Sequence, residues 1–216
     1  SMMMLSFGSL GLIAVLWVIY GYAISFSNGG SATFFGIDGW FGIDTNFIGL
    51  SQQVHEALTS TEMGAYPSLA FVSFQATFAI ITVALISGAI ADRAKFGAWM
   101  VFAALWATIV YFPVANWVFN FTVQDGKVVD GGWIVYNLGV IDFAGGTAVH
   151  INAGAAGLAL ALVLGKRFGF SRGINQPHNV PLTLIGVAIL WFGWFGFNAG
   201  AQAFGDMSSI GLITVN

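Results

Sequence analysis

Continuous apolar runs, separated by polar connections, dominate the pattern along this chain. Five runs occur, at about 5–26, 68–91, 96–119, 143–165 and 182–204. Each reaches the roughly 20 apolar residues that a helix needs to cross a bilayer. A transmembrane barrel would instead show alternating strands of about ten residues, a pattern that these runs lack. The sequence therefore predicts an all-α polytopic membrane protein with five transmembrane helices.

The basic residues gather in the two short connections and so orient the helices. Arg93 and Lys95 lie in the first of these connections, and Lys166, Arg167 and Arg172 lie in the second. In the long connections, 27–67 and 120–142, the one basic residue is Lys127. Basic loops stay in the cytoplasm. We therefore expect 92–95 and 166–181 inside, both long connections outside, the N-terminus inside and the C-terminus outside.

Shorter signals predict structure within and between the runs. A short helix is expected near 50–60 in the first long connection, which otherwise has the composition of a solvated loop. The pairs Asp125-Gly126 and Asp130-Gly131 in the second long connection are typical of turns. Pro113 predicts a kink in the third helix.

Composition supports a membrane protein and excludes several functions. The 216 residues are 57% hydrophobic and 7% charged, and the mean hydropathy is +0.84, whereas soluble domains contain about 25% charged residues. Six Lys and Arg are too few for a phosphate-binding surface, so nucleic acid is not an expected partner. Without Cys, the chain has no disulfide and no thiolate metal site. We expect a multi-pass protein of the inner (plasma) membrane, embedded in the lipid bilayer.

The N-terminal segment does not read as a signal peptide. It lacks a basic n-region and a clear cleavage site. Its abrupt apolar start indicates a chain entered partway through a larger protein.

His150 is the most informative single residue. It lies in an otherwise uncharged helix rich in small residues, seven residues from the expected helix start and about 10 Å from its outer end. A membrane-embedded imidazole is costly and usually faces a cavity or pathway, and histidine exchanges protons near neutral pH. Hydrogen bonding to a neighbouring helix, for packing alone, is the alternative role. The other histidines, His55 and His178, are expected at the surface.

Asp142 lies at the outer start of the same helix. A carboxylate at that position can cap the first backbone N–H groups and complement the helix dipole. It can also attract a cation to a pore entrance, and the two roles are compatible. No Ser-His-Asp pattern, phosphate loop or paired carboxylate is present, so we predict no enzyme, no metal and no cofactor.

Several segments resemble the ammonium transporter family (Amt/Mep/Rh), in its bacterial Amt-like branch. They are FQATF (74–78) followed after eight residues by SGAIADR (87–93), YFPVANWVF (111–119), DFAGGTAVHINAG (142–154), GKRFGF (165–170), PHNVP (177–181) and WFGWFGFNAG (191–200). They occur in the family's order and spacing. The resemblance implies an eleven-span bundle of two inverted five-helix repeats, assembled as a homotrimer with one pore per subunit. Residues 1–216 match spans two to six, as one partial membrane domain without the first span and the second half.

The resemblance also implies roles for single residues. His150 matches the first of two pore histidines, and Phe78 and Phe197 match the two stacked rings of a gate above them. Asp142 matches the acid near an outer cation site, to which Phe74 is also assigned, while Tyr111 and Trp194 match positions in the vicinity of the pore. The family commonly has Trp at position 119 and Ser at position 201, where this chain has Phe119 and Ala201. These exchanges predict a weaker outer site, or one in which Trp117 supplies the indole.

Ammonium transport is the function that the resemblance implies. Ammonium would be recruited at an outer vestibule, pass the phenylalanine gate and lose its proton near His150. An ammonium sensor, in which the same membrane domain is coupled to a signalling module, is the alternative, and a degenerate, non-conducting subunit is a third possibility. The family also implies a PII-type regulator at the cytoplasmic face, where Lys166 to Arg172 lie.

Overall fold

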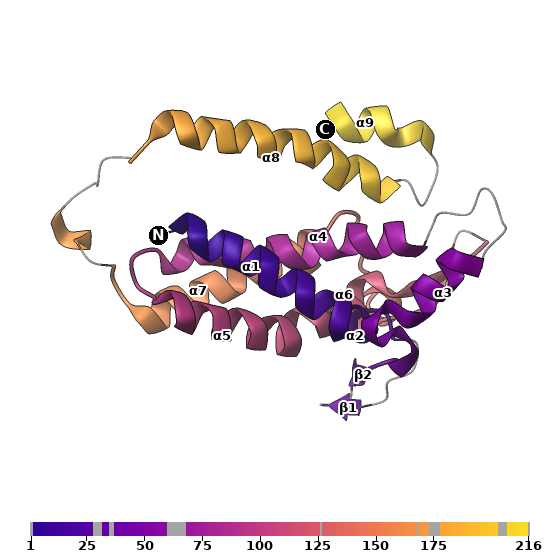
Figure 1. The fold of residues 1–216 in the computed structure, drawn as a ribbon. Helices are drawn as coiled ribbons and strands as arrows, with labels where there is room; N and C mark the ends of the chain where they lie inside the picture. The colour runs from indigo at the N-terminus through magenta and orange to yellow at the C-terminus, as the bar shows by residue number, and fades with distance from the viewer. Residues whose placement is uncertain are drawn as a thin grey trace. The chain divides into compact units, whose positions relative to one another are not determined.

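A computed structural model describes residues 2–27, 32–34, 37–59, 68–125, 127–167, 169–172, 178–202 and 207–215 (Figure 1). These residues belong to two units, Ser1–Phe168 and Gly169–Asn216, which are described separately. The prediction of a single domain therefore stays a prediction.

Five helical segments of the described residues are long and apolar enough to span a membrane. They are Met2–Ser25, Ser68–Ile90, Phe96–Phe119, Gly146–Leu164 and Val180–Ala201. Their number and order confirm the five predicted spans. The fourth begins at Gly146 instead of 143, and the fifth begins at Val180 instead of 182. The side of the membrane on which each end lies stays a prediction.

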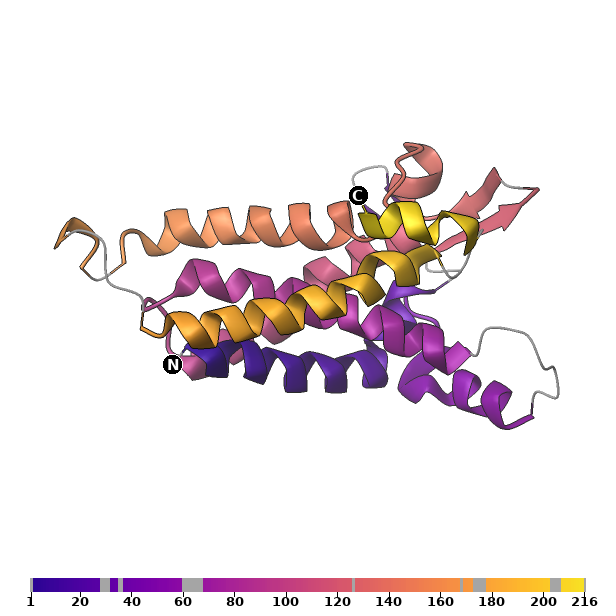
Figure 2. The ribbon, with the colours of Figure 1, turned by 90° about the horizontal axis from the view of Figure 1, so that it is seen from above.

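The first four spans form the helical bundle of the first unit (Figures 1 and 2). The first span consists of α1 (Met2–Leu16), η1 (Trp17–Gly21) and α2 (Tyr22–Ser25); the second of α4 (Ser68–Ile86) and η3 (Ser87–Ile90); the third of α5 (Phe96–Trp106), η4 (Ala107–Tyr111) and α6 (Phe112–Phe119); and the fourth of η6 (Gly146–Ile151) and α7 (Asn152–Leu164). Helix α1 packs against α4 and α5, and α4 packs against α7.

Buried tryptophans hold these spans together through their indole N–H groups. The Trp17 indole donates to the Val72 carbonyl oxygen at 3.1 Å, which joins the first span to the second. The Trp99 indole donates to the Leu5 carbonyl oxygen at 3.1 Å and to the Ser9 hydroxyl at 3.0 Å, which joins the third span to the first. Polar groups inside a membrane protein need partners within the protein. These bonds therefore fix the helix packing as well as satisfying the indoles.

Three of the spans contain a π turn, in η1, η4 and η6. In the third span, η4 ends at Tyr111, two residues before Pro113, whose missing N–H leaves the preceding turn without one of its hydrogen bonds. The helix continues through Pro113 to Phe119. The predicted distortion thus takes the form of a widened turn inside a continuous span.

Both long connections are more structured than predicted, and in the first unit they lie at the end of the bundle opposite 92–95 (Figure 2). The first contains the hairpin β1 (Ala32–Phe34) and β2 (Ile37–Phe41), then η2 (Thr45–Leu50) and α3 (Ser51–Thr59); the second contains the hairpin β3 (Phe121–Gln124) and β4 (Lys127–Gly131), then η5 (Trp133–Asn137). Helix α3 confirms the helix expected near 50–60. Gln124 pairs with Lys127 across the β3–β4 turn, so the turn predicted at Asp125 is also confirmed, while Gly126 lies outside the described residues. The turn predicted at Asp130-Gly131 is wrong, because both residues belong to β4 and pair with β3.

The second unit contains the fifth span, helix α8 (Val180–Ala201). It also contains the short segments η7 (Phe170–Arg172), η9 (Met207–Ser209) and α9 (Ile210–Val215). Asn179 caps α8, because its side-chain oxygen accepts the backbone N–H of Leu182 at 2.9 Å. Pro181 follows at the start of the helix, where its missing N–H costs nothing. Helix α9 contacts α8.

Candidate functional site

The candidate site begins at Asp142, which caps the fourth span. One carboxylate oxygen accepts the backbone N–H groups of Gly145 and Gly146 at 2.7 and 2.8 Å. The other accepts those of Thr147 and Ala148 at 2.8 and 2.9 Å. The capping role predicted from the sequence is confirmed.

This cap also limits what else the Asp142 carboxylate can do. A carboxylate has about four lone-pair positions for hydrogen-bond donors, and four N–H groups occupy them here. Its negative charge stands against the positive end of the helix dipole. The four bonds therefore leave the Asp142 carboxylate little capacity to ligate a cation directly, whereas its charge can still act at a distance. The cation-site assignment itself stays a prediction.

The first turn of the fourth span is a π turn that begins directly after Gly145. The Gly145 carbonyl oxygen accepts the backbone N–H groups of both Val149, at 2.9 Å, and His150, at 3.1 Å. The same oxygen lies 3.2 Å from Nδ1 of the His150 imidazole. The helix begins four residues before His150, which places the imidazole about 6 Å from the helix start, closer than the predicted 10 Å. The ring lies at an exposed position of this unit, where it can meet a solute or another element.

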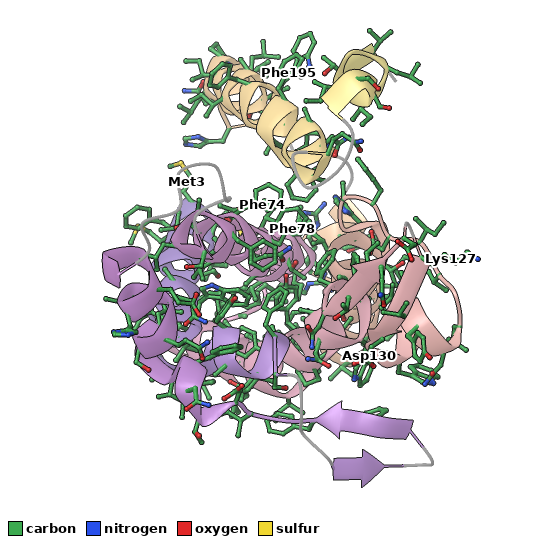
Figure 3. All side chains as sticks on the ribbon, turned by 90° about the vertical axis from the view of Figure 1, so that its right-hand side faces the viewer. Met3, Phe74, Phe78, Lys127, Asp130 and Phe195 are labelled. Carbon is green, nitrogen blue, oxygen red and sulfur yellow. The ribbon has the colours of Figure 1, made fainter. Side chains whose placement is uncertain are left out.

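Phe78 lies beside this turn and is almost completely buried, with 1% of its surface exposed. Its ring centroid is 4.9 Å from that of Phe74 and 5.6 Å from that of Phe119, both in edge-to-face contact. Figure 3 shows the Phe74 and Phe78 side chains close together, and Phe74 is half-buried. The second, third and fourth spans thus meet at Phe78. The structure brings together four residues predicted for the site: Asp142, Phe74, Phe78 and Phe119.

Tyr111 is a buried residue of the same region. Its side chain has no exposed surface, and its hydroxyl lies near the Thr82 hydroxyl and within electrostatic reach of Asp142. Among the described residues, no group stands at hydrogen-bonding geometry from the Tyr111 oxygen. The Thr82 hydroxyl instead donates to the Phe78 carbonyl oxygen at 2.6 Å. Tyr111 and Thr82 therefore form a polar layer next to Phe78.

Trp117 belongs to a different cluster, although it is only two residues from Phe119. Its ring centroid is 4.5 Å from that of Trp40 and 5.9 Å from that of Trp133. Its indole N–H donates to the Trp40 carbonyl oxygen at 3.2 Å. Residues two apart on a helix point to nearly opposite sides, so Trp117 holds the β1–β2 hairpin and η5 against α6 while Phe119 contacts Phe78.

Phe197, Trp194 and Ala201 lie on α8 in the second unit. The Trp194 and Phe197 rings are stacked, with centroids 4.6 Å apart. A cavity of about 270 Å³ within this unit is lined by Trp191, Trp194, Phe195, Asn198, Ala199, Ile213 and Thr214. The assignments of Phe197 to a gate, Ala201 to an outer site and Trp194 to the vicinity of the pore stay predictions.

The sequence did not reveal the roles of three residues: Gly145 and Thr82, which contact Phe78, and Arg93, which joins two spans. Arg93 donates through its two terminal nitrogens to the carbonyl oxygens of Ala89 and Gly165 and so joins the ends of the second and fourth spans. A basic residue directly after a span indicates topology but does not by itself reveal such a bridge. The available clue is its position within the GAIADR segment, at a helix end with free carbonyls.

These features define a class of protein: a polytopic α-helical membrane protein with a capped, histidine-bearing span packed against a buried aromatic cluster. Comparison with known proteins is more specific. The sequence profile of the Ammonium Transporter Family matches residues 1–216, and the chain belongs to this family, whose members are multi-pass membrane transporters and not enzymes.

Individual relatives agree with this assignment. The ammonium transporter of Mycobacterium bovis is 52% identical over 208 residues, which cover 93% of this chain and 43% of that protein. The crystal structure of Saccharomyces cerevisiae Mep2 has a TM-score of 0.72 and 33% identity, covering 94% of this chain and 42% of that one. A solved structure described as a sensor Amt protein has a TM-score of 0.73 and 28% identity, covering 96% and 47%. The chain thus spans less than half the length of these relatives.

Proposed function

We propose that the protein transports ammonium or ammonia across the membrane. The observation that carries the proposal is the contact between the gate and the histidine-bearing turn: Phe78 packs on Gly145, whose carbonyl oxygen is 3.2 Å from Nδ1 of His150. An aromatic ring that excludes water and a group that exchanges protons thereby occupy neighbouring positions. A permeating ammonium ion needs both, since it must shed water and then release its proton.

In this proposal the outer end of the first unit attracts the cation. Aromatic faces bind small cations by cation–π attraction, and Phe74 and Phe119, both half-buried, supply such rings beside Phe78. The charge of Asp142 adds a longer-range attraction. The family resemblance assigns Phe197 as the second ring of the gate.

Deprotonation follows beyond the gate. Ammonium gives its proton to an acceptor near His150 and continues as neutral ammonia, which an apolar pore admits more readily than an ion. Potassium has no proton to release, so the same step discriminates against it. Whether the proton follows the ammonia decides if transport carries current.

Reconstituted full-length protein in liposomes tests this function. His150→Ala should lower ammonium uptake and the ratio of ammonium to potassium flux. The control is His55→Ala, because His55 is an exposed residue of α3 and should leave both quantities unchanged. Unchanged rate and selectivity in His150→Ala would refute the assigned role of His150.

An ammonium sensor is the second candidate, and the likeness to the sensor Amt protein favours keeping it. A sensor binds ammonium and passes little or none. Ammonium binding without uptake or current in the same liposomes would support a sensor.

The family resemblance also supports two partner proposals. One is a homotrimer, which cross-linking in native membranes tests. The other is a PII-type regulator that contacts the basic segment from Lys166 to Arg172, and a pull-down with and without charge reversal of this segment tests it.

A further inference from the structure

Gly145 occupies a backbone conformation that favours glycine. Its φ is 92° and its ψ is 22°, in the left-handed region, where residues with a side chain are disfavoured. It is also the residue directly before the π turn and the first of the four N–H donors to Asp142. A change at Gly145 therefore acts on the start of the histidine-bearing span.

The space around Gly145 is filled by the gate ring. A Cβ atom added to Gly145 would lie 2.8 Å from Cγ2 of Val149 and 3.2 Å from both Cδ1 and Cε1 of Phe78. Phe78 is buried and contacts Phe74 and Phe119 on its other sides. The ring has little room to retreat without displacing those aromatic neighbours.

The carbonyl group of the same residue contacts the histidine. It accepts the backbone N–H of His150 at 3.1 Å and lies 3.2 Å from the imidazole Nδ1. A shift of this carbonyl therefore moves both the backbone and the ring of His150. The Cα side of Gly145 faces the gate, and its carbonyl side faces the histidine.

We propose that Gly145 is a positioning residue that sets the Phe78 ring and the His150 imidazole in one fixed relation. The proposal rests on the transport function proposed above, in which these two groups act in succession. If the Phe78 ring and the His150 imidazole were displaced, ammonium would no longer lose its water and its proton at neighbouring positions. Selectivity as well as rate would then change.

Gly145→Ala tests this proposal, and two other glycines provide matched controls. Gly139 has a positive φ of 63°, and a Cβ atom added there would meet nothing within 4 Å, so Gly139→Ala introduces backbone strain without a clash. Gly146 is adjacent to Gly145 and has no left-handed φ, and an added Cβ would meet only Asp142 Oδ1 at 3.9 Å. Gly146→Ala therefore adds a methyl group to the same turn without strain or clash.

The measurements are ammonium uptake per folded protein in liposomes and the ratio of ammonium to potassium flux. We expect Gly145→Ala to reduce uptake at least tenfold and to lower the ratio, while both control variants stay within twofold of the parent protein. A partly unfolded population would lower both fluxes together and leave their ratio unchanged. A parental ratio in Gly145→Ala, or an equal loss of the ratio in Gly139→Ala, would overturn the proposal.

A second variant is needed if Gly145→Ala does not accumulate as folded protein. The pair Gly145→Ala/Val149→Ala removes the 2.8 Å contact and is compared with Val149→Ala alone, with the same expected loss of the ratio. If the pair also fails to accumulate, Gly145 is needed for folding and the positioning role is rejected. The proposed function fails separately, if the parent protein shows no ammonium uptake in the same liposomes.

Discussion

Replacement of Asp142 by Asn tests whether one carboxylate holds the start of the histidine-bearing span. The two side chains have nearly the same shape, but the amide has one acceptor oxygen and one donor nitrogen. If the oxygen keeps its bonds to Gly145 and Gly146, the new NH₂ group faces the N–H groups of Thr147 and Ala148. Two of the four capping bonds are then lost, and donors oppose donors.

The structure sets the size of the expected effect. An unsatisfied buried donor costs about 1–3 kcal/mol, and the two affected bonds are partly buried, so about 1 kcal/mol each is the appropriate figure. Loss of the negative charge at a helix N-terminus adds about 0.3–1 kcal/mol. The total of about 3 kcal/mol corresponds to a roughly 100-fold change in the equilibrium for opening this turn.

Hydrogen exchange of the full-length protein in detergent measures that opening directly. We expect the amides of the η6 turn to exchange roughly 100-fold faster in Asp142→Asn. Asp44→Asn is the matched control: Asp44 caps η2 by accepting a single N–H, from Asn46 at 2.9 Å, and an amide oxygen can keep that bond. Exchange in η6 that changes less than threefold in Asp142→Asn would refute the capping argument.

Three further predictions concern other contacts. Arg93→Ala should lower the free energy of unfolding by about 1–3 kcal/mol, because two helix-end carbonyls lose their donor. Arg93→Lys should recover less than half of that loss, since an ammonium group cannot donate from two nitrogens at once. Thermal melting measures both effects. Phe119→Trp should lower the KM for ammonium about two- to fivefold, as expected for about 0.5–1 kcal/mol of added cation–π attraction; an unchanged or higher KM would argue against an outer cation site at this ring. Trp117→Phe should leave that KM unchanged but should speed hydrogen exchange in β2, because the bond to the Trp40 carbonyl is lost.

The transmembrane helices were predictable from the sequence because hydropathy and length alone nearly determine them. In a bilayer every backbone polar group must be satisfied within the segment, so a continuous apolar run of this length has one stable conformation. The ends were less accurate. The fourth helix begins at Gly146 because the backbone turns through a left-handed Gly145 first, and apolar character continues through that turn without marking it.

The hairpins of the long connections could not be predicted, since their strands are stabilised by contacts distant in sequence. Trp40 and Trp133 both pack on Trp117, and no local pattern pairs them. The turn at Asp125 was evident because its signal is local. In these connections, the features that could be predicted are those whose signal lies within a few residues of one another.

The same distinction holds within the site. The capping by Asp142 was expected, because the acid and the helix it caps are neighbours in sequence. The contact of Phe78 with Gly145 joins residues of two spans, and only the packing of α4 against the start of the fourth span creates it. The sequence thus identified the candidate residues Asp142, Phe78 and His150, but their placement relative to one another depends on tertiary contacts.

That placement explains why a histidine and a phenylalanine, each common alone, can act as a unit here. A membrane-embedded imidazole without a fixed neighbour would select its own rotamer and its own partners. Here its Nδ1 lies against the Gly145 carbonyl, and the Gly145 Cα lies against the Phe78 ring. Asp142 secures the turn that carries all three through four hydrogen bonds. If the proposed transport function holds, the selectivity of the pathway depends on a glycine and a capping carboxylate as much as on the groups that meet the substrate.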